Sequence, residues 1–168
     1  LGWRAAERAR RAANGRPPAG ALANTIVSSP VLGAIAREYG LDHVETLSGF
    51  KWVSRVPGLV FGFEEALDYL THPSVVRDKD GVSAAADALA MVCELVARGR
   101  TVWDLLDEAS ERFGHFASTQ VVMRLASPAA VAAVAERIRR EPPTEFSGIA
   151  VERIRDFQQP GLSAVPAN

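Results

Sequence analysis

Three short segments of this sequence hold most of the polar side chains that a folded core would not need. They are residues 48–52, 62–69 and 77–81, and each falls where a predicted strand ends or a predicted helix begins. In open α/β sheets the loops at such strand ends form the ligand crevice. Their positions make the three segments candidates for a single binding site.

Two adjacent carboxylates, Glu64 and Glu65, directly follow an apolar run that predicts a strand. Because side chains alternate along a strand, at most one of the two can face a given ligand. A carboxylate accepts hydrogen bonds from vicinal hydroxyls, which suits a sugar, whereas a glycosidase pair must face each other across about 5 to 9 Å. We therefore interpret one glutamate as a hydroxyl acceptor, and the structural alternative is a solvated strand end.

The cations Arg77 and Lys79 precede a helix whose predicted start, near Asp80, offers free backbone N–H groups. Such a place suits a phosphate or a polyhydroxyl ligand held by charge-assisted hydrogen bonds. In the structural alternative Asp78 or Asp80 caps the helix and pairs with the cations, and both interpretations can hold together. Lys51 follows a glycine and an aromatic residue, and by itself it would be a surface lysine.

Charge balance and cysteine count exclude several classes of protein. The chain carries 19 Lys and Arg against 20 Asp and Glu, so neither nucleic acid nor an anionic membrane is expected as a partner. No apolar run approaches the roughly 18 residues of a membrane span. Cys93 is the only cysteine, which favours a reducing, cytoplasmic setting, and the scattered histidines predict no metal site in this chain.

Short apolar runs that alternate with helical patterns predict an α/β arrangement in the first part of the chain. Ser29 and Pro30 provide a helix cap and a proline suited to the first helical turn. The predicted elements are a helix over 3–13, a strand over 21–27, a helix from Pro30 to Gly40, and strands over 43–47 and 59–63.

Two longer helices follow, and each has a predicted inner face. The first covers residues 82–96, and the second begins at a capping box formed by Thr101 and Asp104. The residues expected to face inward are Val82, Ala85, Leu89, Val92, Cys93 and Val96 on the first helix, and Trp103, Leu106, Ala109 and Phe113 on the second.

The remaining residues predict a smaller unit with a strand over 118–125, a helix opened by Ser127 and Pro128, and a strand over 149–154. The expected fold class is therefore α/β, with a three-layer α/β/α domain and a small mixed sheet over residues 1–114. An incomplete α+β domain is expected over residues 115–168. On the last helix Val131, Val134 and Ile138 are expected to face inward.

The three polar segments resemble motifs of the α-D-phosphohexomutases, the phosphoglucomutase and phosphomannomutase family. "SGFKW" resembles that family's Thr-Gly-aromatic-Lys turn, "FGFEEALDYL" its sugar-recognition loop, and "VVRDKDGVSAA" its Arg-acidic-Lys-Asp-Gly helix start. "ANTIVSSPVL" resembles the opening strand and helix of the third domain. The resemblance covers residues 20–115, and residues 116–168 resemble the first half of the fourth domain.

This resemblance implies an isomerase of carbohydrate metabolism that acts as an intramolecular phosphotransferase. In the family, a phosphoserine of the first domain gives its phosphoryl group to a sugar phosphate, and a glucose 1,6-bisphosphate-type intermediate turns over before a phosphoryl group returns. Mg²⁺ held by the second domain stabilises the transferred charge, so its ligands are not expected in this chain.

The resemblance also implies roles for particular residues of this chain. Glu64 is expected to contact sugar hydroxyls, while Lys51 and Lys79 contact the sugar or its phosphate. The full set of expected substrate-binding residues is Ser48, Gly49, Lys51, Glu64, Glu65, Arg77 and Lys79.

This chain departs from the common pattern in the recognition loop. Ala66 stands where many members have serine, and Asp68 replaces a usual glycine. The Glu-Glu-Ala form is similar to a branch that includes phosphopentomutases and glucose 1,6-bisphosphate synthases, so the choice between hexose and pentose stays open.

Family motifs for the phosphoserine loop, the metal loop and the Arg-x-Ser-Gly-Thr-Glu-Pro phosphate loop have no match here, and the chain begins with Leu1. We therefore expect a fragment, cut at both ends, that is inactive alone. Its expected partners are a sugar phosphate and the missing N-terminal domains, and a homodimer through bare apolar surface is a further arrangement to test. The alternative is a non-catalytic module that binds a sugar phosphate or a protein.

Overall fold

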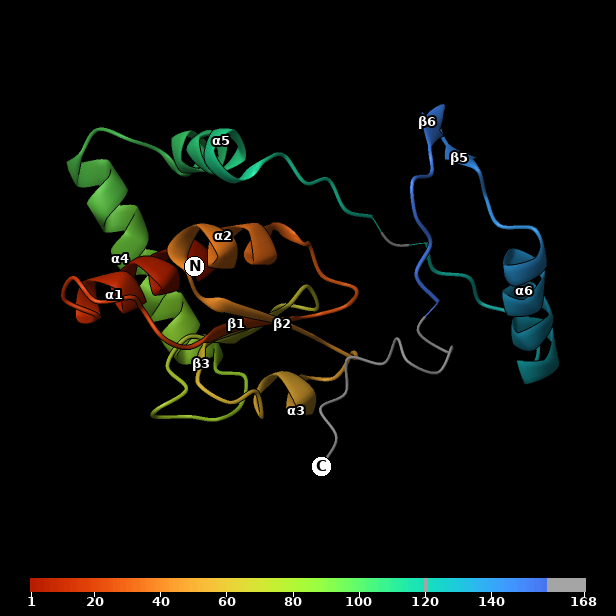
Figure 1. Ribbon diagram of the computed structural model, residues 1–168, viewed down its shortest axis with the longest axis horizontal. Helices are drawn as coiled ribbons and strands as arrows, with labels where there is room; N and C mark the ends of the chain where they lie inside the picture. Colours follow the sequence, from red (N-terminus) through yellow and green to blue (C-terminus); the bar gives the residue numbers. More distant parts are fainter. Residues whose placement is uncertain (120, 157–168) are drawn as a thin grey trace. The chain divides into compact units, whose positions relative to one another are not determined.

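A four-stranded mixed sheet is the central element of the computed structural model, which describes residues 1–119 and 121–156 (Figure 1). The strand order is β2–β1–β3–β4, and β1 lies parallel to both β2 and β3, whereas β4 is antiparallel to β3. The carboxyl ends of β1, β2 and β3 therefore lie at the same end of the sheet. The strands are β1 (Ala21–Thr25), β2 (Asp42–Thr46), β3 (Leu59–Glu64) and β4 (Asp68–Leu70).

Successive residues of β1 point to opposite sides of the sheet, so both faces carry apolar side chains. Helices cover both of these faces. On one face α1 (Gly2–Ala12), α2 (Val31–Tyr39) and α5 (Val102–Phe113) enclose a core that includes Leu22 and Phe61. On the other face the short helix α3 (Phe50–Val53) packs its apolar side chains against Ala21 and Ala23. The predicted three-layer α/β/α fold is confirmed.

The predicted strands and helices of this part are confirmed with shifts of one or two residues at their ends. The cap of α2 is one residue later than predicted, because Pro30 and not Ser29 is its N-cap. Two short elements, α3 and β4, were not expected. A four-residue helix and a three-residue strand are too short to give a periodic apolar pattern.

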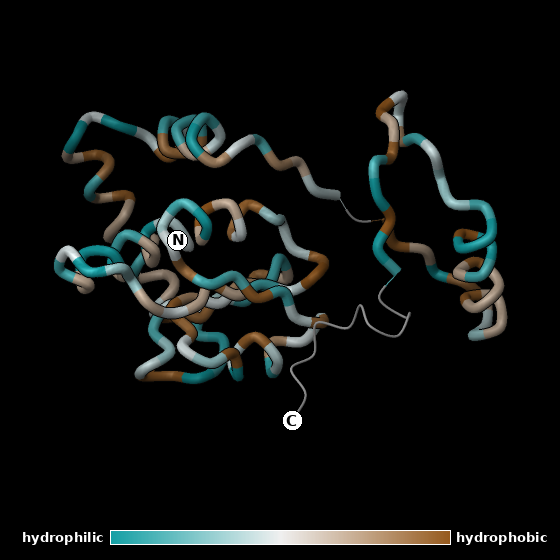
Figure 2. Tube along the Cα trace, in the orientation of Figure 1, coloured by the Kyte–Doolittle hydropathy of each residue, from teal (hydrophilic) through white to brown (hydrophobic). Residues whose placement is uncertain are grey.

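The long helix α4 (Gly81–Ala97) is confirmed as a helix, but its predicted inner face is wrong. Val82, Leu89 and Val96 are 82%, 66% and 67% exposed, and Cys93 is also exposed. The buried residues are instead Ala84 and Leu95, which lie on the opposite side of the helix. The apolar spacing, which Figure 2 shows recurring along this helix, correctly predicts a helix, but no part of residues 1–119 or 121–156 covers that face.

The face of α5 is only partly as predicted. The capping box of Thr101 and Asp104 is confirmed, since each side chain accepts a hydrogen bond from the backbone of the other residue. Phe113 is buried and packs edge-on against Trp3, with ring centroids 5.0 Å apart. Trp103 and Leu106, however, are exposed, because only the C-terminal end of α5 reaches the core.

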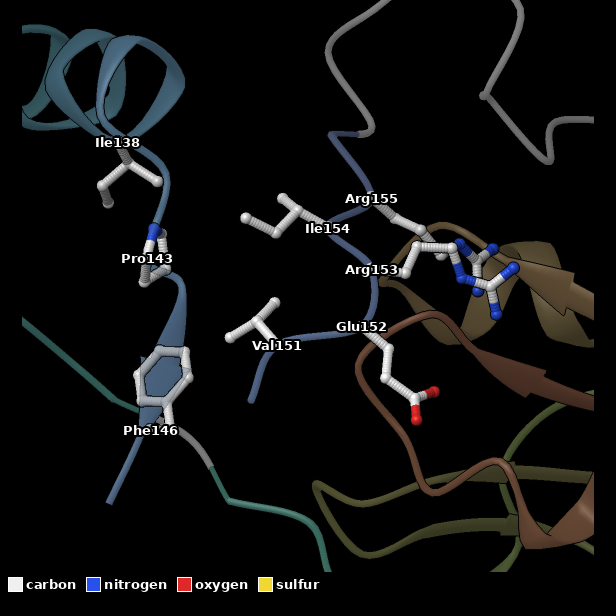
Figure 3. A pocket seen from close by; sticks show the side chains of 8 residues that line it. All are labelled: Ile138, Pro143, Phe146, Val151, Glu152, Arg153, Ile154 and Arg155. Atoms are coloured by element: carbon white, nitrogen blue, oxygen red, sulfur yellow. The ribbon is translucent and has the colours of Figure 1, made fainter. Parts of the chain in front are cut away.

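Residues 1–118 form one compact unit, and a second unit begins at Thr119. In the second unit α6 (Pro128–Arg140) starts at the predicted cap, where Ser127 Oγ accepts a hydrogen bond from Ala130 N at 3.2 Å. None of the residues of α6 is buried, so its predicted inner face is wrong. A cavity of about 620 Å³ lies beside it, lined by residues that include Ile138, Pro143 and Phe146 (Figure 3).

The strands predicted in the second unit are largely wrong. The described residues of 118–125 contain no strand, because none of them pairs with a neighbouring strand. The strand predicted over 149–154 shrinks to β6 (Ile149–Ala150), which forms a hairpin with β5 (Glu145–Phe146). The proposed domain boundary after residue 114 stays a prediction, and residues 157–168 lie outside the described part.

Among residues 1–119 and 121–156, none of the helices combines the length and the apolar character that crossing a bilayer requires.

Candidate functional site

The three parallel strands end at Thr25, Thr46 and Glu64, so the loops that follow them leave the same edge of the sheet. The loop after β3 is a three-residue hairpin that leads into β4, and it includes Leu67, whose φ is 66°. Glu64 stands opposite Asp68 in this hairpin. Most of the residues predicted to bind a ligand lie in or beside these loops.

Glu64 is a nearly buried carboxylate, 7% exposed, at the end of β3. Its Oε1 accepts a hydrogen bond from Ser48 Oγ at 2.9 Å and a longer one from Gly49 N at 3.4 Å. Within the described part of the chain, Oε2 accepts no hydrogen bond and is not among the fully enclosed atoms. One oxygen thus fixes the carboxylate, and the other remains available as an acceptor.

The turn that carries Ser48 depends on a glycine. Gly49 has φ 116° and ψ 114°, a conformation that residues with a side chain rarely adopt, and it caps α3. Lys51 follows in the first turn of α3, where its exposed ammonium lies 5.1 Å from the ring centroid of Trp52. This glycine therefore allows the turn that sets Ser48 Oγ and its own N–H against Glu64.

Glu65 is the first residue of the hairpin loop after β3, and it points to a different loop from Glu64. Its Oε1 accepts hydrogen bonds from Ser29 N at 2.8 Å and from Ser118 Oγ at 3.3 Å. Its own N–H donates to Ser28 Oγ at 3.2 Å. The sequence reasoning missed these serines, although the position of Ser28 and Ser29 just after β1 could have placed them at this edge.

Lys79 reaches back to the hairpin, where its Nζ lies 3.1 Å from Asp68 Oδ2. The hydrogen bond and the charge of Asp68 raise the pKa of Lys79 above its usual value, so the ammonium stays charged at neutral pH. An ammonium has three donors, and Asp68 uses one of them. Asp68, which was noted only as a departure from the family pattern, therefore positions the cation.

Arg77 ties the third polar segment to the backbone just after α3. Its guanidinium Nη2 donates to the carbonyl oxygen of Ser54 at 2.9 Å and to that of Val56 at 3.4 Å. These carbonyls lie just after α3, where the helix leaves acceptors unpaired. The arginine thus holds the segment that begins at residue 77 against the end of α3.

Asp80 starts α4, as the structural alternative had it. Its Oδ1 accepts a hydrogen bond from Val82 N at 3.0 Å, and its own N–H donates to the carbonyl of Tyr69 at 2.8 Å. Hydrogen bonds from the Ser83 side chain and from the N–H groups of Val82 and Ser83 hold the pKa of Asp80 below its usual range. The helix start is therefore tied to β4 next to the hairpin.

Two direct contacts link the three polar segments: Ser48 with Glu64, and Lys79 with Asp68. Arg77 adds a contact to the backbone of Ser54, just beyond the first segment. The assembled groups can accept hydrogen bonds from hydroxyls and donate charge-assisted bonds to an anion. Within residues 1–119 and 121–156, no group of three His, Cys, Asp or Glu side chains could hold a metal ion.

A family model for "Phosphoglucomutase/phosphomannomutase, alpha/beta/alpha domain III" matches residues 3–113, which include the whole sheet and the hairpin. Three curated relatives are also similar to the chain. A "Probable phosphomannomutase" of Haemophilus influenzae is 43% identical over 137 residues, which cover 82% of this chain and 28% of the relative.

A "Glucose 1,6-bisphosphate synthase" of Mus musculus is 37% identical over 146 residues, covering 79% of the chain and 23% of the relative. A "Phosphoglucomutase" of Staphylococcus aureus is 28% identical over 146 residues, covering 81% and 26%. The chain thus spans about a quarter of the length of these curated relatives.

Proposed function

The chain belongs to the phosphoglucomutase and phosphomannomutase family through its alpha/beta/alpha domain III, and on this premise we propose that it is the sugar-phosphate-recognising part of a phosphohexomutase. The whole enzyme interconverts a sugar 1-phosphate and the corresponding 6-phosphate through a bisphosphorylated intermediate. To bind the sugar phosphate in both orientations, the site must form hydrogen bonds with sugar hydroxyls and accommodate a phosphate group nearby.

In this proposal Glu64 accepts hydrogen bonds from sugar hydroxyls through Oε2, because Ser48 and Gly49 already occupy Oε1. Lys79 and Lys51 donate to the sugar or to its phosphate. A carboxylate and an ammonium held on adjoining loops suit a ligand that combines hydroxyls with negative charge.

Two of the proposed substrate-binding residues act on the ligand indirectly. Arg77 donates to backbone carbonyls after α3 and so keeps segment 77–81 in place. Glu65 ties the hairpin to the loop after β1 through Ser29. Both residues position the groups that would touch the sugar phosphate.

The proposal rests mainly on one observation, the anchoring of the Glu64 carboxylate at the same sheet edge as Lys79. A core residue would not need a carboxylate at this place, since a buried charge is unfavourable unless it is bonded. A surface residue would not need a hydroxyl and an amide N–H to hold it. A fixed carboxylate with one available oxygen is instead suited to reading a ligand.

We also propose that the phosphoserine and the Mg²⁺ ligands of the enzyme lie outside this chain. The described residues do not fit a Mg²⁺ site, because no cluster of three ligating side chains is present among them. No step is therefore assigned to a metal here, and the 168-residue chain is expected to bind a sugar phosphate without converting it.

The test is a calorimetric titration of the 168-residue chain with glucose 1-phosphate, mannose 1-phosphate and ribose 1-phosphate. Glu64→Gln keeps the shape of the side chain but removes its charge, so we expect it to weaken binding of the preferred sugar about 10-fold or more. Glu111→Gln is the matched control, because this exposed carboxylate of α5 lies outside the three polar segments, and its effect should stay below about 2-fold.

Equal affinity in the wild-type chain and the Glu64→Gln variant would remove Glu64 from the site. A coupled assay for glucose 6-phosphate, run on the same samples, should show no product. Conversion by this chain alone would contradict the proposed division of labour.

A further inference from the structure

Asp68, the first residue of β4, stands directly opposite Glu64 in the hairpin. Side chains of directly opposite residues in an antiparallel pair share one face of the sheet, with Cβ atoms about 5 Å apart. Leu70, two residues after Asp68, packs with Val53 of α3, so Asp68 also points to the α3 side. Glu64 reaches the turn before α3 through its bond to Ser48. The two carboxylates therefore project side by side on the face that α3 covers.

Each of these carboxylates is held through one oxygen only. Glu64 is bonded through Oε1, and Asp68 through Oδ2, which lies 3.1 Å from Lys79 Nζ. Within residues 1–119 and 121–156, the second oxygen of each group accepts no hydrogen bond, and neither second oxygen is fully enclosed by protein atoms. Two acceptor oxygens on one face are thus accessible to a ligand.

The charges of this pair are offset by Lys79. Like charges directly opposite each other destabilise an antiparallel strand pair, so two carboxylates at this place need a cation. The pKa of Lys79 is raised mainly by the hydrogen bond and the charge of Asp68, and Glu64 adds a smaller contribution. The ammonium therefore interacts with both hairpin carboxylates. Packing alone gives no reason for a second carboxylate opposite the first, whereas a ligand with several hydroxyls does.

We propose that Asp68 is a second hydroxyl-binding residue of the site and that it determines which sugars bind. Two neighbouring hydroxyls of the sugar donate hydrogen bonds, one to Glu64 Oε2 and the other to Asp68 Oδ1. A ligand that lacks one of the two hydroxyls leaves an acceptor unpaired, so the hairpin selects sugars by a pair of adjacent hydroxyls. This inference rests on the proposed sugar-phosphate role of Glu64.

The alternative is that Asp68 acts only through Lys79, as an ion-pair partner that holds residues 77–81. The two roles differ in the effect of a missing hydroxyl. A direct acceptor loses its contribution to binding when the hydroxyl that it binds is absent. A residue that only positions Lys79 contributes equally to the binding of every deoxy analogue, so a series of such analogues separates the two roles.

The test is a calorimetric titration of the 168-residue chain with glucose 1-phosphate and with its 2-deoxy, 3-deoxy and 4-deoxy analogues. Asp68→Ala should weaken binding of glucose 1-phosphate about tenfold, because a hydrogen bond to a charged acceptor is lost. For one deoxy analogue this loss should shrink to about 2-fold or less. Glu64→Ala should show the same reduction with the analogue that lacks the neighbouring hydroxyl.

A Lys79→Gln background removes the ion pair but keeps the Asp68 carboxylate. In this background Asp68→Ala should still weaken binding of glucose 1-phosphate several-fold, and Asp68→Asn, which keeps the size of the side chain, should show the same dependence on the missing hydroxyl. Equal losses for all four ligands, or no effect of Asp68→Ala in this background, would overturn the role of Asp68 and leave that of Glu64 intact. A wild-type chain that binds none of the ligands would contradict the proposed function as well.

Discussion

α2 and α4 are both helices with an apolar face, yet the described part of the chain covers only one of these faces. In α2, Leu32 and Ile35 are 4% and 6% exposed, because they pack on the sheet with Leu22 and Phe61. In α4 the apolar side chains of Val82, Leu89 and Val96 are largely exposed to solvent. The comparison teaches that helical periodicity predicts which residues need a partner, but not whether the same chain supplies it.

The size of the supporting surface explains the difference. α2 lies across the sheet face, whereas α4 packs against β4 at the sheet edge and is tied to α1 by ion pairs. β4 has three residues and spans about 10 Å, while the 17 residues of α4 extend over about 25 Å. A short edge strand cannot bury more than one side of such a helix.

The largest expected effect contrasts the two apolar faces directly. Ile35→Ala should lower the free energy of unfolding by about 3 kcal/mol, because it leaves a cavity in the core. Leu89→Ala should change it by less than about 0.5 kcal/mol in the dilute monomer, since Leu89 is exposed. Urea unfolding measures both values. Similar losses in the two variants would mean that α4 is covered within the chain.

A pair of glycine substitutions compares the packed sheet with the exposed start of α4, and the expected effects are smaller. A Cβ at Gly62 in β3 would come within 2.6 Å of Val53 Cγ1, whereas a Cβ at Gly81 in α4 would meet nothing within 4 Å. Gly62→Ala should therefore cost about 1 to 3 kcal/mol. Gly81→Ala should be neutral or stabilise by up to about 1 kcal/mol. A stability loss in Gly81→Ala would show that the start of α4 is more tightly enclosed.

The smallest expected effect is a loss of α4 stability at acidic pH. Ser83 and the Arg4 guanidinium hold the pKa values of Asp80 and Glu94, respectively, below their usual range. These carboxylates therefore stabilise α4 above about pH 4, and that stabilisation is lost as the pH falls through their lowered pKa values. Hydrogen exchange, corrected for its intrinsic pH dependence, should show α4 losing protection before α2. Simultaneous loss would count against a separately held α4.

The sequence predicted β1 and β3 because buried strands are mostly apolar runs bounded by turn residues. It also predicted β2, a more polar edge strand, from its short length between glycines. It could not predict β4, whose three residues exist as a strand only through pairing with β3. The same reason explains why residues of the segment 118–125 carry a strand-like pattern without forming a strand. Strand formation needs a neighbour as well as a suitable composition.

Part of the candidate site followed from strand geometry alone. Strand alternation predicted that Glu64 and Glu65 would face different ways, and the structure places them against different loops, although Glu65 lies just beyond β3 in the hairpin loop. The backbone contacts of Arg77 could not be predicted, because its acceptors lie more than 20 residues away in sequence. The role of Asp68 was likewise not predicted, because Lys79, which it binds, lies 11 residues away in the loop before α4.

The two donors to Glu64 Oε1 have a consequence for binding. A free glutamate side chain loses about 1.5 to 2 kcal/mol of rotational entropy when it is ordered. Ser48 and Gly49 order this side chain during folding, so a ligand that meets Oε2 finds it already oriented. Such preorganisation leaves more of the interaction energy available for affinity.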